Sequence, residues 1–339
     1  MHLPVGLSRA LRPAFFCDAP VFFKGALCRN VRLGQSRGAA QSATRKRSES
    51  CTNVTDAIVL SILAAFFIAL GIVLSQIGLR GLPALIGASV SVPTSAGLFV
   101  ILFALTVDPG QWHTGSALIF AAAGLVYPAA VTLLNFASNR RLGPNLTAAM
   151  GNLTPLFAIS MAIALLGEVP RAGQWLGIAA ILGGLLMIAS DRLRTHPARH
   201  LWLLLIPLFG AFLRGAAQPL VKLGLDGWPN ALAAATIGYL VSSAVIWTAR
   251  TVVRPGAPVN AGRKARWFVA IGLSNGIGLL CLYAALAVGT VTVVAPLVAT
   301  YPLITMGLNR VILRDRAFSA RVLAGIVVSV AGVVLLLTL

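Results

Sequence analysis

Long apolar runs alternate with short breaks that carry proline, glycine or charge along most of the chain. A helix needs about 20 mostly apolar residues to cross about 30 Å of hydrocarbon. Backbone groups inside lipid must bond to one another, so a spanning run forms a helix and not an open strand. The pattern predicts ten transmembrane helices, at residues 54–79, 84–107, 114–137, 145–166, 172–190, 201–222, 229–249, 265–288, 291–312 and 320–338.

Residues 1–53 do not follow this pattern. They hold nine of the 27 basic residues of the chain and no apolar run longer than a few residues. A segment of this composition cannot bury enough apolar surface to offset the entropy of ordering it. We therefore expect a basic, disordered N-terminal tail ahead of the membrane-embedded part.

The overall composition narrows the class of protein. Apolar residues make up 58% of the chain and charged residues 10%, whereas soluble domains are about 25% charged. The formal net charge of +19 does not indicate nucleic-acid binding, because the basic residues are spread over the tail and short loops without forming a patch. We expect an all-α integral membrane protein whose surroundings are the lipid bilayer, with no nucleic acid as a partner.

The two halves of the apolar region repeat one another. Gln218 follows Gln76 by 142 residues, and Pro302 follows Pro155 by 147. Each half holds five predicted helices, and because five is odd, the second half must enter the membrane from the opposite side. Inverted repeats are the architecture of many secondary transporters. The sequence thus predicts two inverted five-helix modules, at 54–190 and 201–338.

Two stretches also carry a family resemblance. The first runs from Leu142 to Pro155 and on to Leu166-Gly-Glu168, and the second runs from Ala287 through Tyr301-Pro302 to Arg314-Asp315. They resemble the two EamA modules of the drug/metabolite transporter superfamily, over residues 54–339. The resemblance implies a ten-helix carrier with a central cavity between the modules, which exports small metabolites or drugs by alternating access. We expect a multi-pass protein of the plasma (inner) membrane, as a monomer or homodimer.

Arg214 is the most informative candidate for substrate binding. It lies inside an apolar run, eight residues before Lys222, and a charge placed centrally in a membrane helix costs at least about 2.5–3.5 kcal/mol. Arg214 and Gln218 are four residues apart and share one helix face. One interpretation is a cavity cation for an anionic or zwitterionic small molecule. The other is an arginine that bonds to backbone carbonyls and locks helices together.

Further polar residues in apolar runs are weaker candidates, because Asn, Gln and Tyr can either contact a ligand or join helices by hydrogen bonds. Gln76 is the repeat-related counterpart of Gln218, and it is a better candidate because an amide in hydrocarbon needs a partner. Among the Asn and Tyr residues, Asn152 and Tyr301 rank higher, since each lies close to a repeat-related proline where the helix is expected to break. The remaining candidates are Asn275, Tyr283, Tyr127 and Asn135.

Other functions find less support in the residues. An enzyme would need a nucleophile with a base, paired aspartates or a metal motif, and the sequence offers none of these, so we expect no catalytic residues, no metal and no cofactor. Asp56, Asp108, Glu168, Asp226 and Asp315 all lie at predicted helix ends or in loops. A non-transporting membrane scaffold or receptor is the alternative to a carrier.

The orientation in the membrane has two conflicting indications. The odd-numbered connections between helices carry fifteen basic residues, whereas the even-numbered ones carry only Arg171 and Lys222. The positive-inside rule then places both ends of the ten-helix region outside. Similar proteins have both ends in the cytoplasm, and the basic run at Arg45-Lys46-Arg47 favours that orientation.

Overall fold

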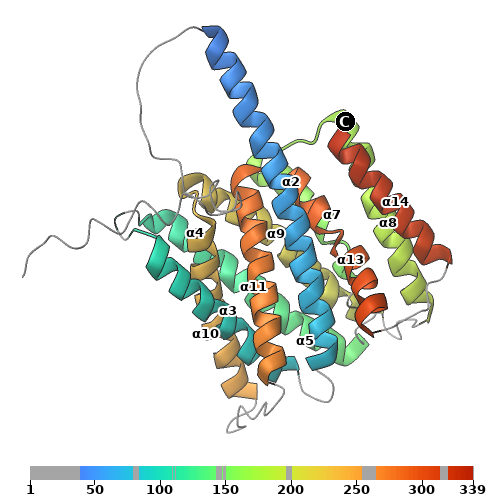
Figure 1. Ribbon diagram of the computed structural model, residues 1–339. Helices are drawn as coiled ribbons and strands as arrows, with labels where there is room; N and C mark the ends of the chain where they lie inside the picture. The colour runs from blue at the N-terminus through green and yellow to red at the C-terminus, as the bar shows by residue number, and fades with distance from the viewer. Residues whose placement is uncertain are drawn as a thin grey trace, which may run out of the picture. The chain divides into compact units, whose positions relative to one another are not determined.

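The computed structural model describes residues 39–78, 84–108, 110, 112–142, 147, 150–195, 201–253, 265–313 and 320–338. The described residues form helices joined by short connections (Figure 1). The α-helices are α2 (Ala39–Gly78), α3 (Ala84–Thr106), α4 (Thr114–Gly124), α5 (Val131–Leu142), α7 (Thr154–Leu166), α8 (Ala172–Thr195), α9 (Leu205–Gly227), α10 (Ala231–Val253), α11 (Ala265–Val288), α12 (Val291–Val298), α13 (Tyr301–Leu308) and α14 (Ala320–Thr338). A π-helical turn, Leu125–Ala130, joins α4 to α5, and another, Asn309–Leu313, follows α13.

Within these residues, seven helical segments are long and apolar enough to cross a membrane. Three shorter apolar helices, Thr154–Leu166, Ala172–Ile188 and Leu323–Thr338, accompany them. Large apolar side chains such as Leu105, Leu118 and Val311 are exposed. Exposed apolar surface of this extent needs lipid around it, and the protein is a multi-pass integral membrane protein.

The chain divides into two compact units, residues 1–52 and 53–339. The structure describes residues 39–52 of the first unit. They are helical and form the beginning of α2, which starts at Ala39. The disorder expected of the N-terminal tail stays a prediction. Residues 1–38 lie outside the described residues.

Helices of the second unit approach one another closely where a glycine, which has no side chain, lies at the contact. Helices α8 and α14 lie side by side (Figure 1), and a methyl group added at Gly332 would meet the backbone nitrogen of Ile181 at 2.6 Å. Helix α3 packs on α10 and α11. There the Ser95 hydroxyl donates a hydrogen bond to the carbonyl oxygen of Gly272 at 2.7 Å. Small residues are the usual device for bringing membrane helices together.

Two apolar runs are interrupted at equivalent places of the two modules. A turn at residues 152–153 precedes α7, and a turn at 299–300 separates α12 from α13. In both cases the helix restarts with a proline in its first turn, Pro155 or Pro302. Proline lacks the N–H that a continuous helix would need, and it is well tolerated at a helix start. The breaks place irregular backbone in the interior of both modules.

Candidate functional site

A cavity of about 290 Å³ lies among helices of both halves of the chain. The first half contributes residues of α2, α3, α5 and the start of α7, and the second half contributes residues of α9 to α13. Both helix breaks reach it, through Asn152 and Ala299. Most of the wall is apolar, as ligand pockets usually are.

Arg214 lies at this cavity, on the middle of α9. Its guanidinium carbon is 5.6 Å from the centre of the Tyr127 ring, a cation–π distance. The Nε atom is buried and has no hydrogen-bond partner among the described residues. Arg214 is also the only charged side chain among the described residues that line the cavity.

Gln218 lies one turn further along α9 and lines the same cavity. The residue is 8% exposed, and its side-chain oxygen has no hydrogen-bond partner within the described part of the chain. The next residue, Pro219, has no N–H and leaves the carbonyl of Gly215 without its usual helical bond. Thr154, which also lines the cavity, has a buried hydroxyl oxygen without a partner among the described residues. Such buried polar atoms cost free energy, so the described lining holds three side chains with an unpartnered atom, those of Thr154, Arg214 and Gln218.

Five other candidates from the sequence also line the cavity. Tyr127 lies at a kink, where its backbone is extended with φ −144° and ψ 127°. The Asn152 amide reaches the carbonyl oxygen of Leu185 only at 3.5 Å, which is a long hydrogen bond. The remaining three are Asn135, Asn275 and Tyr301.

Two candidates lie elsewhere. Gln76 is exposed near the end of α2 and is not among the lining residues, whereas its neighbour Ser75 is. Tyr283 is 2% exposed and belongs to the apolar core, whose other members include residues of α3, α9 and α10. The cavity is also lined by hydroxyl-bearing side chains that the sequence analysis did not single out, namely Ser75, Ser91, Ser95, Thr132, Thr154 and Tyr239.

The cavity is displaced toward one end of the helix bundle. Its lining residues come from the second half of α2 (68–75), the first half of α3 (87–95) and residues 268–282 of α11. It therefore extends toward the end where α2 finishes and α3 and α11 start. It stops before the last turn of α11, which ends at Val288.

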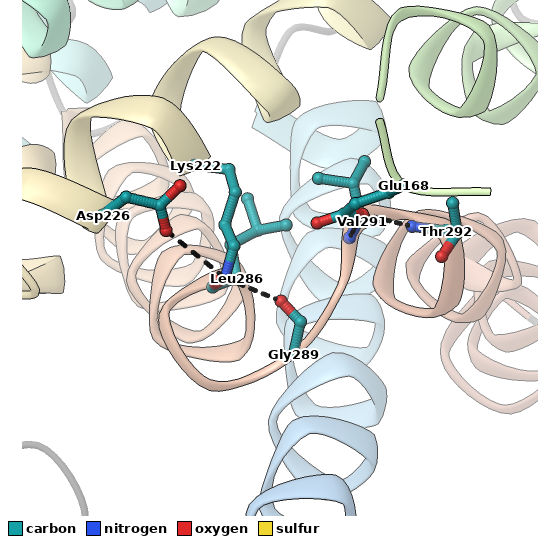
Figure 2. Close-up of polar contacts among 7 residues, drawn as sticks. All are labelled: Glu168, Lys222, Asp226, Leu286, Gly289, Val291 and Thr292. Carbon is teal, nitrogen blue, oxygen red and sulfur yellow. Dashed lines mark hydrogen bonds and ion pairs between the residues drawn. The ribbon is translucent and has the colours of Figure 1, made fainter. Parts of the chain in front are cut away.

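At that opposite end, charged side chains hold the connection between α11 and α12 (Figure 2). The Lys222 ammonium donates to the carbonyl oxygens of Leu286 at 2.7 Å and Gly289 at 3.1 Å. The backbone N–H of Val291 donates to Glu168 Oε2 at 2.7 Å. A cation thus meets the C-terminal end of α11 and an anion the N-terminal end of α12, as the helix dipoles favour. We call Glu168, Lys222 and the 286–292 backbone the helix-end clamp.

The clamp joins the two halves of the chain, since Glu168 follows α7 while Lys222 and residues 286–292 belong to the second half. Asp226 lies at its rim, with Oδ1 3.9 Å from the Lys222 nitrogen and a side chain that is 58% exposed. Partial burial raises the pKa of the Glu168 carboxyl above its ordinary value of 4.5. The backbone hydrogen bonds from Val291 and Thr292 and the charge of Lys222 oppose that rise.

These features define a class of protein, a multi-pass membrane protein whose two halves enclose a partly polar cavity. Both halves match the model of the EamA-like transporter family, at residues 55–190 and 200–338. The chain belongs to this family, and it is a membrane transporter of the drug/metabolite superfamily.

The comparison with solved structures agrees with this assignment at the level of fold. One crystal structure, titled only "Crystal structure of protein", superposes with a TM-score of 0.70 and 14% sequence identity. The superposition covers 83% of this chain and 96% of the other. At this identity the likeness shows a shared fold alone. No curated protein matches the sequence.

Proposed function

We propose that the protein is a secondary carrier that exports small metabolites across the plasma (inner) membrane by alternating access. The observation that carries this proposal is the cavity, whose wall is built by helices of both halves of the chain. A site at the interface of two modules becomes accessible from either side when one module rocks against the other. We further propose that the modules, 54–190 and 201–338, are inverted five-helix repeats, which makes ten transmembrane helices.

The helix-end clamp supports a closed gate at one end. The cavity approaches the start of α11 and stops short of its last turn, where Lys222 and Glu168 hold the α11–α12 connection. In an alternating-access cycle the clamp would separate when the opposite end closes. Because the clamp bridges the two halves of the chain, its separation requires the halves to move relative to each other.

Flux measurements test the carrier function. Comparative metabolite profiling of cells with and without the protein should reveal a compound whose distribution between cell and medium changes. The full chain in proteoliposomes should then give saturable flux of that compound and counterflow when the same compound is present inside. A purified, folded protein that shows neither would indicate a scaffold or receptor instead.

A cross-link tests the gate. In a variant with Glu168→Cys and Thr290→Cys and with the native cysteines replaced, a short cleavable thiol-reactive linker should hold the clamp closed. We expect flux to stop on linking and to return on cleavage, whereas either single-cysteine variant should be unaffected by the reagent. Undiminished flux in the fully linked protein would contradict the proposed gate.

The orientation of the chain in the membrane determines whether the clamp lies on the cytoplasmic or the outer side. A cysteine introduced near Pro258 lies in one of the basic connections. Labelling by an impermeant reagent from outside the cell would place the ends of the ten-helix region in the cytoplasm and the clamp on the cytoplasmic side. Protection would place the clamp outside, as the positive-inside rule predicts.

A further inference from the structure

No described residue that lines the cavity gives the guanidinium of Arg214 an anionic partner. An arginine side chain carries five N–H donors and a permanent charge, yet its contact in the described structure is the face of the Tyr127 ring. Its Nε is buried without a hydrogen bond, and no acidic side chain is found among the described residues that line the cavity. Arg214 is half-buried, and a partly buried charge with no counter-charge beside it attracts an anion, so this site favours a ligand that brings negative charge.

Gln218 adds a second requirement. Its side-chain oxygen is buried and accepts no hydrogen bond within the described part of the chain. Residues four apart on a helix are neighbours on one face, so a ligand group next to the one on Arg214 meets this amide. The acceptor is satisfied by an O–H or N–H donor on the ligand. A ligand with an anionic group and an adjacent donor satisfies both residues.

The charge of the cavity distinguishes between the possible donors. An ammonium group would bring a positive charge beside Arg214, where the described lining offers no carboxylate to balance it. A hydroxyl donates the same hydrogen bond and carries no charge. The electrostatics therefore favour a ligand of net charge −1 over a zwitterion, and they disfavour a cation most strongly.

The rest of the cavity wall indicates the size and polarity of the part of the ligand that does not contact Arg214 or Gln218. Ile72, Phe268 and Leu279 are among the apolar side chains that line it. A volume of about 290 Å³ is at the lower bound of the roughly 300–1,000 Å³ found for ligand pockets. The space suits a metabolite with a short apolar chain.

We propose that the cavity binds a small 2-hydroxy monocarboxylate with an apolar side chain, with the carboxylate on Arg214 and the hydroxyl on Gln218. The planar guanidinium can bind a carboxylate through two parallel hydrogen bonds. This proposal rests on the proposed transport function for its biological meaning, but the binding itself is measured without transport.

Four probes with the same branched body test the assignment. They are 2-hydroxy-4-methylpentanoate, leucine, 4-methylpentanoate and leucinol, and the full chain in lipid nanodiscs is titrated with each by calorimetry. We expect the hydroxy acid to bind most tightly, leucine and 4-methylpentanoate more weakly, and leucinol not at all. Tightest binding of leucine would assign the site to zwitterions and overturn the proposal, as would binding of leucinol or of none of the four.

Variants of the two residues make the test specific. Arg214→Gln should weaken binding of the hydroxy acid roughly 10- to 100-fold, the range for losing hydrogen bonds to a charged group. Arg266→Gln is the matched control, since Arg266 is an exposed arginine near an aromatic ring, outside the cavity lining. If Arg214→Gln does not fold, Arg214→Lys keeps the charge and should show a smaller loss. Unchanged affinity in the folded variant would overturn the proposal.

Gln218→Leu tests the hydroxyl contact on its own. The variant should bind 4-methylpentanoate and the hydroxy acid about equally, whereas the native protein prefers the hydroxy acid. If the variant still binds the hydroxy acid more tightly than 4-methylpentanoate, a group other than Gln218 contacts the hydroxyl. If the hydroxy acid binds as expected but proteoliposomes show no flux, the binding site stands and the carrier function is refuted. If a compound is transported at the same rate with and without Arg214, the carrier function stands and the binding site is refuted.

Discussion

Two cations on α9 have opposite surroundings. Arg214 and Lys222 are eight residues apart on α9, about 12 Å along the axis at 1.5 Å per residue. Lys222 donates to two carbonyl oxygens at the end of α11. Arg214 has a ring face beside it and a buried Nε without a partner among the described residues.

The different surroundings indicate different roles: Lys222 stabilises the fold, and Arg214 is available to bind a ligand. The bonds of Lys222 are made within the protein, so it contributes to stability whether or not a ligand is present. Within the described part of the chain, the Arg214 Nε has no acceptor and the cavity lining has no acidic side chain, so a ligand can supply both. A side chain whose hydrogen bonds are incomplete in the folded protein costs stability and is retained for function.

The largest expected effect comes from Arg214→Gln. Transport of an anionic substrate should fall roughly 10- to 100-fold, because a charge-assisted hydrogen bond is lost at the site. The melting temperature should stay the same or rise, since the variant removes a half-buried charge that no acidic side chain of the described cavity lining balances. Flux per folded molecule and thermal unfolding in detergent check both parts. A variant that melts early and transports normally per folded molecule would show that Arg214 is structural.

Lys222→Met should give the opposite pattern. The change leaves the carbonyls of Leu286 and Gly289 without their donor and should lower the free energy of unfolding by about 1–3 kcal/mol. Ligand affinity at the cavity should change less than twofold, because Lys222 is not among the lining residues. Thermal unfolding and probe titration of the same preparation check this. Weaker binding with unchanged stability would place Lys222 at the binding site.

The pH dependence of the clamp is a smaller effect. Burial raises the pKa of the Glu168 carboxyl above 4.5, so the folded protein binds a proton there more tightly than the unfolded chain. The contribution of Glu168 to stability is therefore full below pH 4.5 and is lost as the pH rises through the raised pKa. Glu168→Gln removes this dependence. The melting temperature of the native protein minus that of the variant should fall between pH 4.5 and 7, and a rising difference would contradict the sign.

Asp226→Asn should have the smallest effect. The carboxylate is 58% exposed and 3.9 Å from the Lys222 nitrogen, and exposed ion pairs contribute about 0–1 kcal/mol. We expect no resolvable change in melting temperature or in flux at physiological salt. A loss as large as that of Lys222→Met would mean that the ion pair, and not the helix-end hydrogen bonds, holds the clamp.

Much of the fold follows from the sequence because lipid imposes a simple rule on apolar runs. The breaks at 152–153 and 299–300 were also predictable, since Pro155 and Pro302 remove backbone donors at repeat-related positions. The start of α2 at Ala39 was not, because helix propensity in a polar segment says little about where a helix begins.

The candidate site was predictable only in its residue types. Polar side chains in apolar runs are few, and seven of the nine candidates line the cavity. The rotation of a helix about its own axis depends on tertiary packing, so Gln76 is exposed while Ser75 lines the cavity. Glu168 was recognisable as a helix-end residue, but the helix end that it meets is 123 residues away in sequence.

Pro219 has a mechanical consequence for α9. It lies between Gln218, at the cavity, and Lys222, at the clamp, and it deprives Gly215 of a helical bond. A helix bends most easily where a backbone hydrogen bond is missing, and sharp bends in helices occur mostly at proline. We therefore expect α9 to bend more easily near Pro219 than elsewhere along its length, so that part of a tilt imposed at the cavity end does not reach Lys222.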